Sequence, residues 1–445
     1  LKVFVGQPNA NPDANPANDT LITDSLVPAL QGYYTIGSNA ADFPSIGAAD
    51  TALQRGGVAG WVSFGLQPGT YTEKVMLEGV LGASPTDTIT FRATNGDSSS
   101  VNWIASGTSN DNYVLFLNDA HHYRFKDLGL RNSNSTYPRV VVIDSGSTHN
   151  AFINTDISSA LTSGFGHFDA LVDVEDNFIH THLSWTGCTF RNGTYGVYLD
   201  GEYNSGNYVA ANKIENSIFL DQDDQGLYGK YQKGILVKGN TFRNKNSGYT
   251  AVELDDNIEL NLLANRFFLE NGYGIFLDDP RSGSDTNRVA NNLVVLSGNS
   301  DRYGIRLYSA VKTSVAFNTV RIHNTNSSSL AFEDSYNSNG LRIVNNIFHH
   351  HQGGLAMDVN SSSSNGISNY NNYYTTGPDL IDYSGSKAQD LAGLQSLTGE
   401  DARSLQTDPG FRDSTSARMT SATLDEAALP LAAVITDITG ANRAA

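Results

Sequence analysis

A short motif built around asparagine returns about every 26 residues through the middle of the chain. It reads KGNTF at 238–242, LANRF at 263–267 and IVNNIF at 343–348. Each unit also carries a second short apolar run, such as GIFL at 274–277, without the spacing of a helix. Short strands repeating at this period predict an all-β fold, a right-handed parallel β-helix in which each repeat forms one coil. We expect roughly ten or more coils, with a short helix capping each end.

The recurring asparagines predict how neighbouring coils are held together. Ten positions align at this period: Asp127, Asn154, Cys188, Asn216, Asn240, Asn265, Asn291, Asn318, Asn345 and Asn371. Equivalent positions in stacked parallel coils lie ~4.8 Å apart, so aligned amides can hydrogen-bond from coil to coil. Asparagine also tolerates the left-handed backbone conformation that a tight corner needs. We therefore expect an asparagine ladder at one corner, with Cys188 as a small buried residue in the same position.

The charge balance and the cysteine count exclude several classes of protein. The formal net charge is −18 at pH 7, which argues against a nucleic-acid partner because phosphate binding needs clustered Lys and Arg. A single cysteine allows no intrachain disulfide. No apolar run approaches the ~18 residues that would cross a bilayer, so the sequence predicts no transmembrane segment.

The two ends of the chain lack the repeat. Residues 42–57 predict a helix that Asp42 or Ser45 would cap, and SKAQDLAGLQSLTG at 386–399 predicts a second helix. We expect three parts: 1–90 as an arm, capping helix and first strands, 91–374 as the β-helix, and 375–445 as a C-terminal cap. The arm, residues 1–30, should pack on the first helix or on a neighbouring chain, because an unattached arm would fray.

Several stretches resemble a known module. YYTIGS (33–38), DFPSIGAADTAL (42–53) and GWVSFGLQPGTYTEKV (60–75) resemble the opening of right-handed β-helix repeats in large secreted and cell-surface proteins of Bacteroidota-type bacteria. TDPGF (407–411) and VITDITGANRAA (434–445) resemble the close of that module. The resemblance implies an extracellular or outer-surface location and a longer parent chain. The opening is also distantly similar to pectin methylesterases, but their catalytic aspartate motifs have no match here, so that activity is not implied.

Acidic residues end the second strand of most repeats. In sequence register they form a column of Asp144, Glu175, Asp200, Lys230, Asp255, Asp278, Tyr308, Glu333 and Asp358. Stacked carboxylates raise one another's pKa unless a cation intervenes, and Lys230 or a calcium ion would supply one. The alternative is that these acids are solvated turn formers, since Asp often bonds its own backbone in a turn.

The column suggests one specific chemistry. A calcium-assisted polysaccharide lyase neutralises the carboxylate of a uronic acid and removes the neighbouring C5 proton with a base. Lys230, or Lys233 as a second candidate, would be that base. The calcium ligands would be Asp200, Asp255, Asp256 and Asp278. A shift of one residue in the register would remove Lys230 from the column.

Two further groups of residues are candidates for a site. His180 and His182 alternate, so in a strand they would face the same way, and with His149 they suggest an alternative metal site. The other interpretation is a ladder of stacked rings. Tyr198, Tyr228 and Tyr231 lie in the middle coils and could stack on sugars, or they could fill the core.

Together these features predict a rigid extracellular bacterial module acting as a surface scaffold, adhesin or glycan-binding element. The alternative is the calcium-assisted lyase. The expected partner is a polysaccharide or cell-surface glycan, and self-association is left open. A search for ultraviolet-absorbing unsaturated products would separate the two functions.

Overall fold

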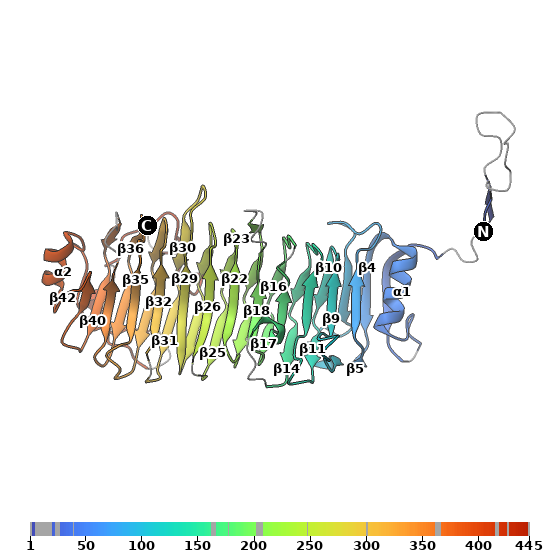
Figure 1. Cartoon of the computed structure of the whole chain (residues 1–445), viewed down its shortest axis with the longest axis horizontal. Helices are drawn as coiled ribbons and strands as arrows, with labels where there is room; N and C mark the ends of the chain where they lie inside the picture. Colours follow the sequence, from blue (N-terminus) through green and yellow to red (C-terminus); the bar gives the residue numbers. More distant parts are fainter. Residues whose placement is uncertain are drawn as a thin grey trace, which may run out of the picture.

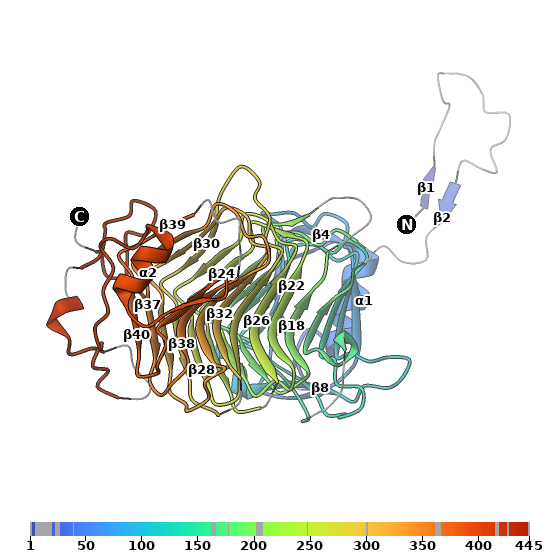
Figure 2. The same cartoon turned by 60° about the vertical axis from the view of Figure 1, so that its left-hand side comes forward.

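The chain winds into an elongated stack of coils, with α1 (Ile46–Gly56) near one end and α2 (Leu391–Thr398) at the other (Figure 1). The computed structural model describes residues 2–4, 20–22, 27–38, 40–161, 166–176, 178–201, 208–246, 248–299, 301–360, 366–413, 418–424 and 427–443. Within these residues, three sheets of 13, 12 and 13 strands run along the stack, and strands of neighbouring coils pair in parallel (Figure 2). Each coil gives one strand to each sheet, so the predicted parallel β-helix is confirmed.

The three sheets form the sides of the coils. The first sheet runs from β3 (Leu30–Ile36) to β39 (Ile367–Asn369), the second from β5 (Gly69–Thr72) to β40 (Asn372–Thr375), and the third from β6 (Val75–Glu78) to β42 (Ser386–Ala388). The third sheet ends differently from the rest, because β42 pairs with β41 (Ile381–Tyr383) in the antiparallel direction.

Aromatic rings of successive coils stack inside the solenoid. On the second sheet, Phe190, Phe219, Phe242 and Phe267 follow one another with ring centroids 4.5 to 4.9 Å apart, and all four are fully buried. This separation equals the ~4.8 Å spacing of parallel strands, so the register itself places like rings in contact. Each buried Phe side chain stabilises the fold by about 2 to 3 kcal/mol relative to its exposed state. The repeat of the sequence therefore becomes a continuous column of rings.

The asparagine ladder exists, but at some coils it lies one residue later than predicted. It runs through Asn240, Asn265, Asn292, Asn318, Asn346 and Asn371, and each Nδ2 donates to the Oδ1 of the next at 2.9 to 3.0 Å. Asn291 and Asn345, which the sequence placed in the ladder, occupy the preceding corner with φ of 59° and 61°. Where two asparagines are adjacent in sequence, a motif alignment cannot tell which one lies at the left-handed corner and which one is in the ladder.

The same shift applies at the N-terminal coils. Asp127, Asn154 and Asn216 also have positive φ and form corners. Upstream of the asparagines, the ladder position is held by smaller residues: the Cys188 amide donates to Oγ of Ser217, at 3.0 Å, and Thr155 Oγ1 donates to the Phe125 carbonyl, at 3.2 Å. Cys188 is buried in this position, as predicted.

Both predicted capping helices are present. Ser45 caps α1 by accepting a hydrogen bond from the amide of Ala48, so Ser45 rather than Asp42 is the cap. Ile46, Ala49 and Leu53 are the buried face of α1. At the other end, Asp390 caps α2, which begins later than the sequence suggested because 386–388 form β42.

Most of the N-terminal arm lies outside the described residues, so its predicted packing has no structural description there. Within the arm, β1 (Lys2–Phe4) and β2 (Thr20–Ile22) pair with each other in the antiparallel direction. Leu30 is buried, and its amide donates to the carbonyl of Gly57 at 2.9 Å. The described chain is therefore attached to the solenoid from Leu30 onward.

Candidate functional site on the third sheet

The outward face of the third sheet carries two parallel rows of polar side chains. Its central strands are β15 (Val172–Val174), β18 (Tyr195–Leu199), β22 (Gln225–Lys230), β26 (Tyr249–Asp255), β29 (Gly272–Asp278), β32 (Tyr303–Tyr308) and β35 (Leu330–Ser335). The outer row, at the strand ends, runs Asp144, Glu175, Asp200, Lys230, Asp255, Asp278 and Tyr308. The predicted order is confirmed over this part, including the position of Lys230 between two aspartates.

Beyond Tyr308 the predicted order is wrong. Tyr308 pairs with Ser335, whereas Glu333 pairs with Arg306 on one side and Asp358 on the other. Glu333 lies two residues before Ser335, and a shift of two along a strand keeps the face but changes the row. Glu333 and Asp358 therefore belong to the second row.

That inner row was not recognised from the sequence. It runs Asp173, Tyr198, Tyr228, Glu253, Phe276, Arg306, Glu333 and Asp358. The signal was present, because each member from Asp173 to Arg306 stands two residues before the expected column position of its coil. Its mixture of rings and charges hid the pattern, since no single residue type repeats along it.

Lys230 is held as a cation. Its Nζ forms an ion pair with Oδ2 of Asp255 and lies 5.1 Å from the centre of the Tyr231 ring. Burial by itself lowers the pKa of Lys230, but the hydrogen bond and the charge of Asp255 outweigh burial, and the pKa is raised. A lysine that holds its proton more firmly is a poorer base. Lys233 is on β23 (Gln232–Lys233), which pairs with β19 (Val209–Ala210) in a separate two-stranded sheet.

The four predicted calcium ligands do not converge. Asp256 occupies a left-handed corner with φ of 51°, and its Oδ1 is 2.5 Å from Nη2 of Arg281. Asp255 pairs with Lys230, and Oδ2 of Asp200 accepts from the Tyr198 hydroxyl at 3.3 Å. Burial, and next the charge of Asp255, raise the pKa of Asp278. Protein cations therefore already neutralise two of the four carboxylates.

Two of the three predicted tyrosines form one stack. The rings of Tyr198 and Tyr228 are 4.8 Å apart at 19°, and His167 stacks on Tyr198 at 5.1 Å. Tyr231 is not part of this stack, because it lies at a left-handed corner with φ of 53°. Both faces of the Tyr198 ring are thus occupied by protein. What the stack offers to a ligand is its hydroxyl groups and ring edges.

Glu253 follows Tyr228 in the inner row, and its pKa is strongly perturbed. Its Oε2 accepts a hydrogen bond from Nε2 of Gln225 at 2.9 Å. Burial raises the pKa of Glu253 to about 7, helped by the charges of Asp255 and Asp278. Near neutral pH this side chain can therefore either donate or accept a proton.

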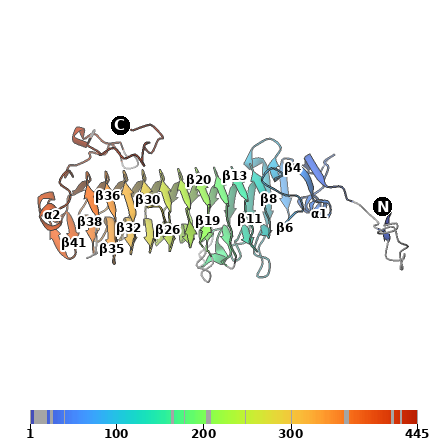
Figure 3. The same ribbon diagram turned by 90° about the horizontal axis from the view of Figure 1, so that it is seen from above.

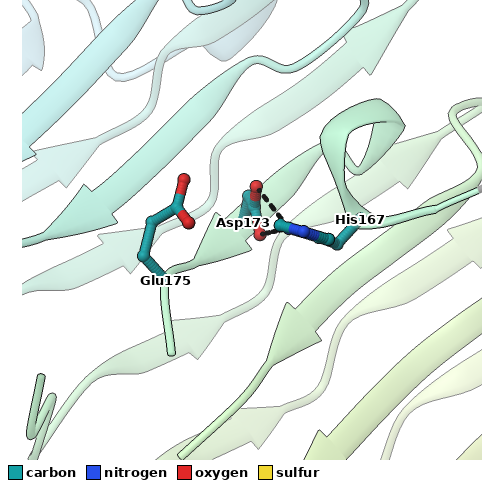
Figure 4. Close-up of side chains that lie close together, drawn as sticks. All are labelled: His167, Asp173 and Glu175. Atoms are coloured by element: carbon teal, nitrogen blue, oxygen red, sulfur yellow. Dashed lines mark hydrogen bonds and ion pairs between the residues drawn. The ribbon is translucent and has the colours of Figure 1, made fainter. Parts of the chain in front are cut away.

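An ion-pair cluster lies at the upstream end of the inner row. His167 Nδ1 is 3.2 Å from Oδ1 of Asp173, and His167, Asp173 and Glu175 come from η3 (His167–Asp169) and the region of β15 (Figure 4). Their ligand atoms lie within 4.8 Å of one another, the only such group of three among the described residues. Arg139 fills the space, with Nη1 2.6 Å from Asp173 and 2.8 Å from Glu175.

This cluster is an ion-pair network rather than an open metal site. Asp173 is fully buried, and Arg139 supplies the positive charge a metal would otherwise bring. The hydrogen bond to Asp173 raises the pKa of His167. Neither His167 nor Arg139 was predicted, because they come from loops outside the repeat.

The alternative metal site of the histidines is not formed. His149 and His182 stack face to face at 4.3 Å and 6°, and His122 stacks on His149 at 5.0 Å. His180 points into the core, fully buried, with Nδ1 3.3 Å from the Ser147 carbonyl. His182 has φ of 58°, so the segment is a corner, and the alternation of a straight strand does not apply. The ladder interpretation is therefore correct for His149 and His182.

Comparison with known proteins supports the fold. The profile of a family described as right handed beta helix region matches residues 179–374, so these coils form a right-handed parallel β-helix. None of the curated protein sequences matches the chain. Among the described residues, no helix is long and apolar enough to cross a membrane.

Solved structures resemble the chain at low identity. A GH136 lacto-N-biosidase from Eubacterium ramulus is 10% identical, with 79% of this chain and 68% of that one covered and a TM-score of 0.49. The surface adhesin PfbA of Streptococcus pneumoniae is 13% identical, with 76% and 88% covered and a TM-score of 0.41. The A-module of a mannuronan C-5 epimerase from Azotobacter vinelandii is 11% identical, with 81% and 95% covered and a TM-score of 0.45.

Proposed function

We propose that this chain is an extracellular bacterial β-helix module that binds glycans on the outward face of its third sheet. One observation carries the proposal: the hydroxyl of Tyr228 lies among several carboxylates on a rigid sheet. In register Tyr228 pairs with Glu253, and the neighbouring outer row places Asp200 and Asp255 on the adjacent coils. Burial, and next the charge of Asp255, raise the pKa of Tyr228. Hydroxyl and carboxylate oxygens side by side can accept and donate hydrogen bonds to the hydroxyls of a sugar.

The charge of this face favours an uncharged glycan. Six carboxylates belong to the central coils: Asp173, Glu175, Asp200, Glu253, Asp255 and Asp278. Arg139 pairs with Asp173 and Glu175, and Lys230 pairs with Asp255, so Asp200, Glu253 and Asp278 carry the excess negative charge of this face. A uronic acid would add a negative charge beside them, at a cost that rises as the site excludes water. A neutral sugar brings hydroxyl donors instead, which match carboxylate acceptors. The face therefore selects neutral or amino sugars over uronic acids.

The geometry also weighs against the lyase alternative. Its base would be Lys230, whose proton is stabilised by Asp255, and its calcium ligands are spread over separate ion pairs. An absorbance assay on uronate polymers, with calcium present, checks this directly. Formation of an unsaturated product by the wild-type chain, lost on Lys230→Met, would restore the lyase function and displace the binding proposal.

The binding proposal is tested with Tyr228→Phe, which removes a single oxygen. A screen on immobilised neutral glycans identifies a ligand, and calorimetry then measures its affinity. We expect Tyr228→Phe to weaken binding about tenfold, the value of roughly one good hydrogen bond. Tyr308→Phe is the matched control: Tyr308 also projects from the third sheet, two coils beyond the Asp255 coil, stacked on Tyr336 at 5.0 Å. Equal losses in both variants, or no neutral ligand at all, would refute the proposal.

A further inference from the structure

The outward face of the first sheet has the opposite charge from the third. In register, one of its rows contains Lys213, Asn261, Arg288, Ser314 and Arg342. Lys238 lies in the neighbouring row, and Lys312 precedes β33 (Thr313–Ala316) at the corner. The chain has a net charge of −18, yet these cations gather on one side of the solenoid. Positive and negative charges are therefore separated between the first and the third sheet.

The C-terminal segment turns this face into a cleft. The C-terminal segment runs back over the sheet (Figure 3). Its residues 430–436 line one side of a cleft of about 740 Å³. Among the described residues, the lining of the cleft includes Lys238, Arg288, Lys312 and Arg342 and contains no Asp or Glu. Within the part of the chain that the structure describes, none of these four cations lies in an ion pair. Glu215 is the register partner of Lys238 but lies outside the lining, so the floor of the cleft holds four cations with one carboxylate beside it.

The segment 430–436, which forms the roof of the cleft, is held by the side chains of two corner asparagines that lie outside the ladder. Asn345 Nδ2 donates to the Leu429 carbonyl at 2.8 Å, and the Leu429 amide donates back to Oδ1 of Asn345 at 2.8 Å. Asn291 Nδ2 donates to the Thr436 carbonyl at 2.7 Å. The guanidinium of Arg443, which bonds Oδ1 of Asn291 at 2.7 Å, lies 3.8 Å from the centre of the Phe317 ring. The roof is therefore attached on both sides of the cleft.

The geometry points to a binding site for an anionic polysaccharide, one that carries carboxylate or sulfate groups. The cations extend from β24 (Leu236–Lys238) to β36 (Arg342–Val344), four coil steps or ~19 Å, which is the reach of a chain rather than of a single small anion. Arg288 and Arg342 are two coils apart, so they would contact charges separated by ~10 Å along that chain.

The rest of the lining fits a sugar chain better than a nucleic acid. Leu263, Leu431 and Val434 contribute apolar surface that the C–H faces of sugar rings can cover. None of the described residues that line the cleft is aromatic, so they do not provide the base stacking that drives binding of single-stranded nucleic acid. The acidic third sheet repels polyanions, which directs such a ligand to the first sheet.

The test uses oligosaccharides of equal length and different charge. Oligogalacturonate and a sulfated dextran oligomer should bind, with affinity falling as salt is raised, whereas neutral dextran should not. The double substitution Arg288→Gln with Arg342→Gln should weaken binding about a hundredfold, about tenfold for each lost charged contact. Lys213→Gln is the matched control, because Lys213 has the same row and face but does not line the cleft. It should change affinity less than about twofold.

Several results would overturn the inference. These are unchanged affinity in the double variant, an equal loss in Lys213→Gln, binding of neutral dextran that the double variant weakens equally, or binding of oligothymidylate as tight as that of the anionic sugars. If the double variant unfolds, Lys238→Gln with Lys312→Gln provides the same test, since both side chains are exposed. The outcome is separate from that of Tyr228→Phe, which changes a different face.

Discussion

Replacing Asn292 by alanine should be among the most destabilising polar substitutions in the solenoid. Its side chain makes four hydrogen bonds in the ladder. Nδ2 donates to the Leu262 carbonyl at 2.9 Å and to Oδ1 of Asn318 at 2.9 Å. Oδ1 accepts from the backbone amide and from Nδ2 of Asn265, at 2.9 and 3.0 Å. At about 1 kcal/mol for each bond, the loss is about 4 kcal/mol of unfolding free energy.

The neighbouring residue provides the control. Asn291 has φ of 59°, which glycine adopts without strain. The side-chain amide of Asn291 donates to the C-terminal segment and not to the ladder. Asn291→Gly removes two hydrogen bonds to the C-terminal segment and should cost about 2 kcal/mol, half the loss expected at Asn292. Urea unfolding followed by far-ultraviolet circular dichroism measures both variants, and hydrogen exchange at the Asn265 amide reports the ladder locally. Equal destabilisation by the two substitutions would show that the ladder is not what holds adjacent coils together.

Three other predictions follow from buried or paired groups. Burial raises the pKa of Glu253 from 4.5 to about 7, so the folded state retains a proton that the unfolded state releases. The free energy of unfolding should therefore fall by up to about 3 kcal/mol as pH rises from about 5 to about 7. Glu253→Gln should abolish that part of the pH dependence in urea melts. Burial also raises the pKa of Cys188 to about 12, so a thiol reagent should react only after unfolding, and rapid labelling of the native protein would contradict the buried position. Since Lys230 and Arg281 neutralise the neighbouring aspartates, millimolar calcium should leave the thermal unfolding midpoint unchanged; a rise that Asp278→Asn removes would reveal a site there.

The candidate site was predictable only in part. The order from Asp200 to Tyr308 could be read from the repeat, because each coil contributes one strand end at a nearly constant spacing. Coils differ in length, however, and after Tyr308 the predicted register is wrong by two residues, because Ser335 rather than Glu333 follows Tyr308 in the row. Loop residues such as Arg139 and His167 carry no periodic signal, so their ion pairs with Asp173 could not be predicted.

The sequence by itself determined the architecture. Repeating short strands at a period near 26 residues can bury their apolar side chains only by stacking, and stacking in register places like residues ~4.8 Å apart. Tertiary structure decided which side chains of the stacked coils form ion pairs and which ones remain exposed to a ligand. Asp255 holds the proton on Lys230, and the corner conformation separates His180 from His182. The return of residues 430–436 over the first sheet made a cleft from cations as far apart in sequence as Lys238 and Arg342. Local periodicity specifies which residues align, whereas pairing of charges and coverage of faces depend on contacts between distant parts of the chain.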